Sequence, residues 1–474
     1  MKKVIILIGA GMLMLLGVGG SCGVSGVKIL KGMAENRPGE FGRWQGVFRW
    51  CARGLPFVDN LPEWVGDKTY IVLLQNNTEL RPTGGFMGSY IRARFKDGGL
   101  VDWTAQDIYE PDGKLAGHVE PPYPVQEAFR QGWWRLRDSN WDPDFASAAA
   151  TVAWFLEQGG EEKIDGVMAI NLELVNSILK ILGPVEVVTY GETVTDKNLY
   201  NLAQSYAEVD WKPGSTQKRD FLGAVGTAVW ERMKNIRPGQ AVKLAGLVKA
   251  QLDKKQILVW IGEEKLQAEI REWGWDGGLG NYYGDYLYIV ETNLGANKAN
   301  CCINRELRHE VEIGDGELRE RIEVEWQNDN PFENPRPPYF WGGDYIDYVR
   351  VVVPREARVV VVSVSVSGEK VRPQAQGDFA RPSSLRQERS EEVWVEEERE
   401  RVRIIGFWVV VPARERVAAE VKYELPGDEF ADMYRVLVKR QPGIEKFAYR
   451  LTVNGIVRRE GEVMKDERIE AGME

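Results

Sequence analysis

The sequence predicts a membrane anchor, then a mixed α/β region, then an all-β region. An apolar run follows two lysines at the N-terminus, strand and helix patterns alternate over residues 68–292, and short alternating strands fill 293–474. Strand–helix alternation favours a mixed sheet covered by helices, and repeated short strands with turn residues favour a β-sandwich. We therefore expect an anchor helix at 1–26, a helical stem at 27–67, an α/β domain at 68–292 and a sandwich at 293–474.

The composition is that of a folded protein. Of the 474 residues, 43% are hydrophobic and 28% are charged, as in globular chains. A chain of this length is expected to form more than one domain. The formal net charge of −10 argues against a general nucleic-acid-binding protein, because binding to backbone phosphates needs a basic surface.

The N-terminal segment determines the expected location. Lys2 and Lys3 precede an apolar run over residues 4–18. We expect an uncleaved, single-pass membrane anchor with the lysines on the cytoplasmic side. The alternative is cleavage with lipidation of Cys22, although Gly19 stands where such signals carry an aliphatic residue. Either outcome places the bulk of the chain outside the cytoplasm.

The α/β region is expected to contain strands at 70–74, 88–95 and 166–170, and helices at 147–158, 172–182, 221–234 and 242–253. Asp144 or Ser147 can cap the first helix, and Gly159 with Gly160 ends it.

The all-β region is expected to begin near residue 297. Charged and apolar residues alternate there, which is typical of a strand with one wet face. The expected strands are 307–313, 318–326, 348–353, 358–366, 392–395, 402–411, 418–423, 434–439 and 447–453.

A polar segment after the first strand is a candidate ligand-binding loop. It contains Arg81, Gly84 and Gly85. Glycines allow the backbone to approach a ligand, and arginine presents a planar fork to phosphate or carboxylate. The alternative is a hairpin connection in which the two glycines serve only the turn geometry.

Two more clusters combine carboxylates with arginine. Asp107 and Asp112 lie in one, and Arg137 and Asp138 lie in the other. A magnesium-assisted phosphoryl or pyrophosphate site needs these groups, with Asp107 and Asp112 as metal ligands and one of the three aspartates as catalytic base. The alternative is that the aspartates form turns and caps, and that Arg137 makes a structural ion pair.

Several longer motifs resemble an uncharacterised bacterial family, the domain of unknown function "four-zero-one-two". They occupy residues 76–90, 137–145, 164–167, 293–298 and 439–443. The resemblance implies that the family covers nearly everything after the anchor.

The order of parts in the α/β region also resembles the LytR-CpsA-Psr enzymes, which transfer glycopolymers from polyprenyl-pyrophosphate to the cell wall. The matching parts are the anchor, the loop at Arg81, the strand at 164–171, the segment at 182–187 and the Lys218-Arg219-Asp220 stretch before a helix. The resemblance implies phosphate binding by Arg81, Arg137 and Arg219. The chain departs from these enzymes where Asp107 to Asp112 replaces their Ser-Ile-Pro-Arg-Asp-like strand.

Cysteine and histidine predict no metal site of their own. The chain has only His118 and His309, and it has no CxxC pair. Cys51 can form a disulfide with Cys301 or Cys302 in an oxidising compartment, or the three can be unpaired buried thiols.

We therefore expect an envelope protein that binds or transfers a polyprenyl-pyrophosphate-linked glycan, with the membrane and a cell-wall polymer as partners. The alternative is a non-catalytic envelope or adhesion module with the same fold. Convergence of the three arginines and the aspartates on one apolar cleft would favour the first function.

Overall fold

The structure is a computed structural model. It describes residues 60–208, 217–234, 236–280, 284–314, 316–330, 342–367, 394–427, 430 and 432–472, together with Lys28 and Arg43. The predicted anchor and most of the predicted stem lie outside these residues. Within the described ranges, no helix is both long and apolar enough to cross a membrane.

The chain divides into two compact units. The first contains the described residues up to Asn76, with Phe86–Gly117 and Arg135–Gly278. The second contains Asn77–Gly85, His118–Trp134 and the described residues from Leu279 onward. Strand β8 (Asp285–Val290) precedes the predicted boundary at 292/293 but belongs to the second unit.

The first unit is built around a five-stranded mixed sheet in the order β3-β2-β1-β4-β7. Strand β1 pairs antiparallel with β2 and parallel with β4, and β7 is antiparallel to β4. The strands of this sheet are β1 (Lys68–Asn76), β2 (Phe86–Lys96), β3 (Gly99–Asp107), β4 (Gly166–Asn171) and β7 (Ile257–Ile261). A small separate hairpin is formed by β5 (Val185–Val187) and β6 (Glu192–Val194).

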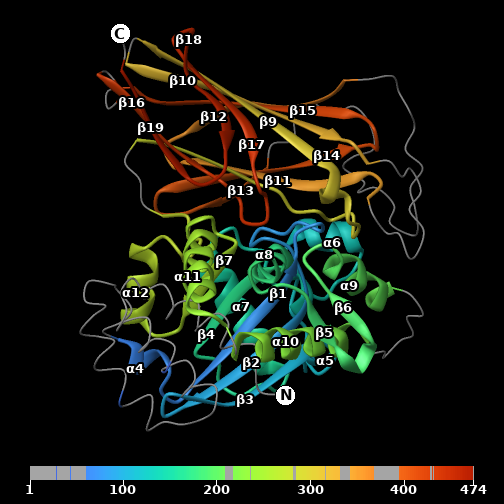
Figure 1. The fold of residues 1–474 in the computed structure, drawn as a ribbon. Helices are drawn as coiled ribbons and strands as arrows, with labels where there is room; N and C mark the ends of the chain where they lie inside the picture. The colour runs from blue at the N-terminus through green and yellow to red at the C-terminus, as the bar shows by residue number, and fades with distance from the viewer. Residues whose placement is uncertain are drawn as a thin grey trace. The chain divides into compact units, whose positions relative to one another are not determined.

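Helices cover this sheet (Figure 1). The helices of the first unit are α4 (Leu61–Trp64), α5 (Tyr109–Asp112), α7 (Phe145–Gln158), α8 (Leu172–Leu182), α9 (Leu199–Glu208), α10 (Gln217–Lys234), α11 (Pro238–Asp253) and α12 (Glu264–Glu272), with short 3-10 turns η2 (Leu136–Asp138) and η3 (Val188–Tyr190).

Local signals explain where two of these helices begin. The Asp144 side chain accepts the backbone N–H groups of Ala146 and Ser147 at the start of α7, as predicted. The Asn171 side chain accepts the N–H of Leu174 and so caps α8, which runs over the predicted residues 172–182. All six residues of β4 are buried, as expected for a strand covered on both faces.

The two faces of β1 contribute to different layers. Tyr70 and Val72 join a hydrophobic cluster that includes buried side chains of α8, α9, α10 and α11. Ile71 and Leu73 are equally buried but lie outside that cluster, because successive side chains of a strand point to opposite faces.

The second unit is largely β-structure, with two six-stranded sheets. Their orders are β12-β15-β10-β9-β17-β18 and β13-β14-β11-β8-β16-β19. The strands are β8, β9 (Ile303–Gly314), β10 (Glu317–Asn328), β11 (Tyr345–Pro354), β12 (Arg358–Ser367), β13 (Trp394–Glu398), β14 (Val402–Val411), β15 (Arg416–Pro426), β16 (Met433–Lys439), β17 (Phe447–Val453), β18 (Ile456–Val463) and β19 (Glu467–Gly472). The unit also contains α6 (Tyr123–Phe129) and the 3-10 turn η4 (Ala299–Cys302).

One hydrophobic core joins these two sheets. Val324 of β10 and Val421 of β15 come from one sheet, and Val351 of β11 and Phe407 of β14 come from the other. Most strand pairs are antiparallel, but β8 pairs parallel with β16, and β9 pairs parallel with β17. Alternating burial along β10 confirms the predicted strand with one wet face.

Candidate functional site

An apolar cavity of about 130 Å³ lies inside the first unit. It is bounded by strands β1, β2 and β4 and by helices α8, α9 and α10. Its lining residues are Val72, Leu74, Gln75, Asn76, Gly88, Ile91, Ile170, Asn171, Leu172, Leu174, Val175, Ile178, Leu199, Ala203, Gln204, Leu222, Val225, Gly226 and Val229. Engineered apolar cavities of roughly 150 Å³ stay dry and bind a ligand the size of benzene.

Regular secondary structure places the apolar lining. Val72 and Leu74 are two residues apart on β1, so both point to the same face of the sheet. Leu222, Val225 and Val229 recur at helical spacing on one face of α10. Ala203 of α9 has a small side chain at this lining, and small residues leave open volume between packed elements.

The polar lining is made of neutral amides. The polar residues of the lining are Gln75, Asn76, Asn171 and Gln204, and all four are uncharged. The Asn171 amide donates to Gln256, while its oxygen caps α8. Among the described residues no lysine or arginine lines the cavity, so its chemistry suits an uncharged, largely apolar group.

Three of the predicted site residues lie together in the first unit. The Asp112 carboxylate accepts the Leu136 N–H at 2.7 Å and the Arg137 guanidinium at 3.0 Å. Arg137 Nε also lies 3.6 Å from Asp138, and its guanidinium lies 5.4 Å from the ring centroid of Tyr109. Burial raises the pKa of the Asp112 carboxyl above its usual range, and the Leu136 N–H and Arg137 oppose that shift.

Asp107 and Arg219 are placed by their elements. Asp107 ends β3, accepts the Tyr109 N–H at 2.8 Å, and pairs in register with Ser89, the neighbour of cavity-lining Gly88. Arg219 belongs to α10, one turn before cavity-lining Leu222; its side chain lies outside the described residues.

Arg81, Gly84 and Gly85 belong to the second unit. The Arg81 side chain is buried, and it donates to the carbonyl oxygens of Leu80 and Asn293 and to the Glu79 carboxylate. The structure therefore brings Arg137 together with Asp112 and Asp138, whereas Arg81 bonds to other groups within the second unit.

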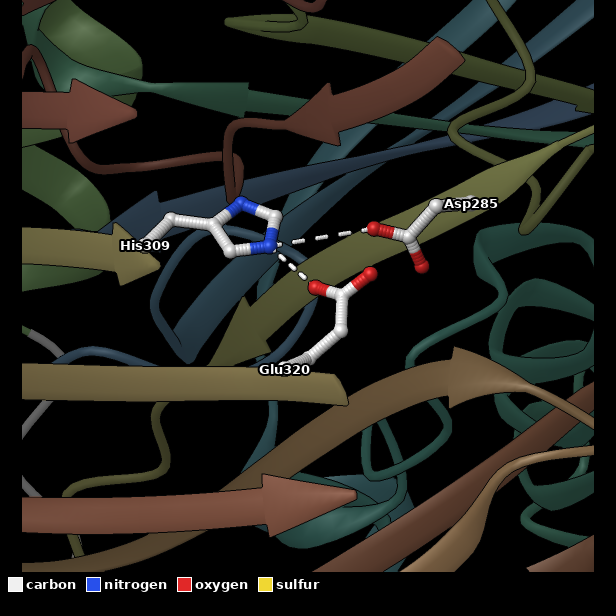
Figure 2. Close-up of side chains that lie close together, drawn as sticks. All are labelled: Asp285, His309 and Glu320. Atoms are coloured by element: carbon white, nitrogen blue, oxygen red, sulfur yellow. Dashed lines mark hydrogen bonds and ion pairs between the residues drawn. The ribbon is translucent and has the colours of Figure 1, made fainter. Parts of the chain in front are cut away.

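A buried cluster of ionisable groups was not predicted from the sequence. Asp285, His309 and Glu320 lie side by side in the second unit (Figure 2). On β9, His309 follows the inward-pointing Leu307 and precedes the inward-pointing Val311, so strand alternation alone could have placed this histidine in the core. Its sequence neighbours gave no sign of Asp285 or Glu320.

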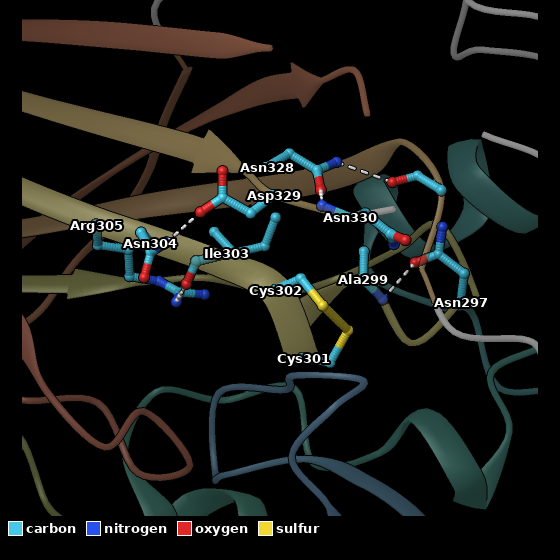
Figure 3. The surroundings of a disulfide bond; sticks show 11 residues. Asn297, Ala299, Cys301, Cys302, Ile303, Asn304, Arg305, Asn328, Asp329 and Asn330 are labelled. Carbon is cyan, nitrogen blue, oxygen red and sulfur yellow. Dashed lines mark hydrogen bonds between the residues drawn. A yellow bond between two sulfur atoms is a disulfide. The ribbon is translucent and has the colours of Figure 1, made fainter. Parts of the chain in front are cut away.

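The cysteines pair differently from either expectation. Cys301 forms a disulfide with the adjacent Cys302 at the end of η4 (Figure 3), and their Cα atoms are 3.8 Å apart. Cys51 lies outside the described residues. The predicted disulfides joined Cys51 to one of the two later cysteines, so a bond between neighbouring residues was not expected.

Residues 65–207 match a family model described as "Protein of unknown function (DUF4012)". The match spans about 30% of the chain, so the wider coverage expected from the sequence motifs was wrong. It includes the strands β1, β2 and β4 and helices α8 and α9, which bound the cavity.

No curated protein matches the chain significantly. Among solved structures, the Lin1025 protein of Listeria innocua is 11% identical, with a TM-score of 0.25, over 44% of this chain and 79% of that one. A candidate nutrient binding protein from Legionella pneumophila is 10% identical, with a TM-score of 0.18, over 32% of this chain and 50% of its own. Similarity at this level carries no argument about function. Residues 65–207 are thus similar to a family of unknown function.

Proposed function

We propose that this protein is a membrane-anchored, extracytoplasmic component of the cell envelope that binds polyprenyl-pyrophosphate-linked glycans. The cavity in the first unit supports this proposal most directly. It combines an apolar interior with an amide lining, as a site for the prenyl end of a lipid carrier requires. We also propose that the first unit is LytR-CpsA-Psr-like and that the two sheets of the second unit form a β-sandwich.

The size of the cavity limits what it holds. At about 130 Å³ it accommodates a group comparable to benzene, which corresponds to roughly one isoprene unit. The remaining prenyl chain would stay in the bilayer to which the N-terminal helix anchors the protein. Each buried methylene contributes up to about 0.8 kcal/mol to binding, so the five carbons of one isoprene unit set an upper limit of about 4 kcal/mol.

Arginines would hold the phosphate end. Arg219 is the best placed of the predicted set, because its backbone lies one turn from cavity-lining Leu222. Arg137 would contribute only by exchanging its contacts with Asp112 and Asp138. Magnesium at Asp107 and Asp112 would neutralise the remaining phosphate charge, and glycopolymer transfer would then use Asp138 as base.

A non-catalytic role is the second candidate, and one observation favours it. Asp112 and Asp138 are each only 5% exposed, and Asp112 already accepts a backbone N–H and the Arg137 guanidinium. Carboxylates held in this way stabilise a loop. A binding module that presents lipid-linked glycan without transferring it would need the cavity but not these aspartates.

Binding measurements with prenyl pyrophosphates of increasing length test the proposal. Titration calorimetry should show tighter binding of the C5, C15 and C20 prenyl pyrophosphates than of inorganic pyrophosphate, with most of the gain reached at C5, because the cavity holds about one isoprene unit. Farnesol, which lacks the phosphates, tests the apolar contribution alone. Equal affinity for inorganic pyrophosphate and all prenyl compounds would exclude the cavity as the prenyl site. Arg219→Ala should weaken binding of the pyrophosphates and leave farnesol unaffected.

A further inference from the structure

Three ionisable side chains meet inside the core of the second unit (Figure 2). Asp285 comes from β8, His309 from β9 and Glu320 from β10, so both six-stranded sheets contribute. Asp285 and His309 are 0% exposed and Glu320 is 2% exposed. Groups of this kind are rarely buried together unless something compensates their charge.

The three side chains turn their ligand atoms toward one another. His309 Nε2 contacts Glu320 Oε2 and lies 3.8 Å from Asp285 Oδ2. One ligand atom from each residue lies within 4.8 Å of the other two. Metal–ligand bonds of about 2.0–2.2 Å separate neighbouring ligand atoms by roughly 3–3.5 Å, so small side-chain rotations would suffice to enclose an ion.

Three tyrosines surround this group. Tyr449 Oη lies 3.0 Å from His309 Nδ1, the ring nitrogen that points away from the carboxylates. Tyr434 donates to Asp285 at 2.5 Å, and Tyr423 donates to Glu320 at 3.1 Å. Metal-binding histidines commonly have the second ring nitrogen held by a polar partner, and metal-binding carboxylates are themselves hydrogen-bonded.

The charge balance also favours a cation. Among the described residues, no lysine or arginine forms an ion pair with Asp285 or Glu320; both carboxylates lie against His309 instead. If both carboxylates were ionised, the dry core would hold two negative charges, and burying uncompensated charge costs several kcal/mol per ion. A divalent cation with two carboxylates and a neutral imidazole has no net charge.

We propose that Asp285, His309 and Glu320 bind a structural divalent transition-metal ion, for which zinc is the natural probe. One nitrogen and two carboxylate ligands suit zinc and its first-row neighbours, and the neutral Tyr434 hydroxyl, 3.3 Å from His309 Nε2 and from Glu320 Oε1, can hydrogen-bond these ligands. Because the site is enclosed, the ion would be incorporated as the two sheets close, and its binding would stabilise the folded unit.

Metal analysis of the purified full chain tests this inference. The protein is expressed in zinc-supplemented medium, and its metal content is measured by plasma mass spectrometry and native mass spectrometry. We expect close to one first-row divalent ion per chain. Glu320→Gln should lower that content at least five-fold.

Glu291→Gln is the matched control. Glu291 is equally buried in the same unit, but it pairs with Arg305 and Tyr345 outside this cluster. This variant should therefore retain the metal even if it is less stable.

Two results would overturn the inference. One is wild-type protein with less than a tenth of an ion per chain, which would mean that protons alone compensate the carboxylates. The other is equal metal content in wild type and Glu320→Gln, which would place the ion elsewhere. If Glu320→Gln does not fold, refolding of wild-type protein from denaturant decides the question. A larger fraction of the protein should regain the native circular dichroism spectrum with zinc than with a chelator. Equal recovery would count against a metal.

Discussion

Filling the cavity of the first unit should raise stability and lower ligand binding at the same time. Ala203 lines the cavity and is only 6% exposed, so Ala203→Leu would direct three further carbon atoms into the empty volume. A substitution that merely damaged the fold would lower both quantities together. Opposite signs would therefore separate loss of the ligand space from general damage to the fold.

The expected magnitude follows from the added apolar groups. Three buried carbons at about 0.8 kcal/mol each set an upper limit of about 2.4 kcal/mol. Imperfect fit takes back part of this gain, so we expect the free energy of unfolding to rise by about 1–2 kcal/mol. For a unit of this size, each kcal/mol corresponds to about 2–4 °C in melting temperature.

Urea denaturation and calorimetry with C15 prenyl pyrophosphate provide the two readouts. Ala203→Leu should bind at least ten-fold more weakly than wild type. Ala250→Leu on the exposed side of α11 adds the same atoms outside the cavity, and it should change neither quantity appreciably. Lower stability of Ala203→Leu would show that the space is not available to a side chain, and unchanged binding with higher stability would show that the ligand binds elsewhere.

Three further predictions concern stability and location. Asp347 is fully buried, and burial followed by the Glu291 carboxylate raises its pKa well above the usual range. The unfolded Asp347 carboxyl ionises near pH 4, so wild-type stability is highest at low pH and falls as the pH rises toward the folded pKa. The free energy of unfolding of Asp347→Asn should therefore rise relative to that of wild type by up to about 1.4 kcal/mol per pH unit above pH 5. A difference in stability that stays constant with pH would contradict this assignment. Gly443 has φ of +86°, and an added Cβ would lie 2.1 Å from the Gly84 carbonyl oxygen, so Gly443→Ala should lower the free energy of unfolding by more than about 2 kcal/mol. Gly455 has φ of +78° but open space around it, so Gly455→Ala should lower it by only about 1–2 kcal/mol. Urea denaturation measures both values. Deletion of residues 2–24 should move the protein from the membrane to the soluble fraction on cell fractionation, and retention in the membrane would refute the predicted anchor.

Local signals predicted much of the fold. Helix α8 and strands β14 and β17 have the bounds expected from the sequence. The Asn171 cap and Gly183 mark the two ends of α8, Pro412 follows β14, and Asn454 with Gly455 follows β17. Strand β8 was missed although it is central in its sheet. Its six residues are almost all buried, so they show no alternation, and its pairing with β16 joins distant parts of the chain.

The candidate site was less accessible from sequence for a physical reason. The cavity depends on the joint packing of side chains as far apart in the chain as Val72, Ala203 and Val229, and no local pattern reports an unfilled volume. The polar loop at Arg81 was predicted to be a ligand-binding loop or a hairpin connection, whereas its hydrogen bonds to Asn293 and Gln441 are long-range. Sequence therefore identified polar segments more readily than the contacts that determine their roles.

The division of the second unit into three stretches of chain has a consequence for synthesis. The Arg81 carbonyl bonds to Gln441, which is 360 residues later in the sequence. At about 5–20 residues per second, a ribosome needs roughly 20–70 s to make the intervening chain. The first unit ends at Gly278 and can fold within that interval, whereas residues 77–85 cannot form their contacts with the second unit until its later strands are made. A recombinant fragment that starts after β8 would lack both a central strand and this segment, so soluble expression of the second unit requires a rearranged gene that restores them.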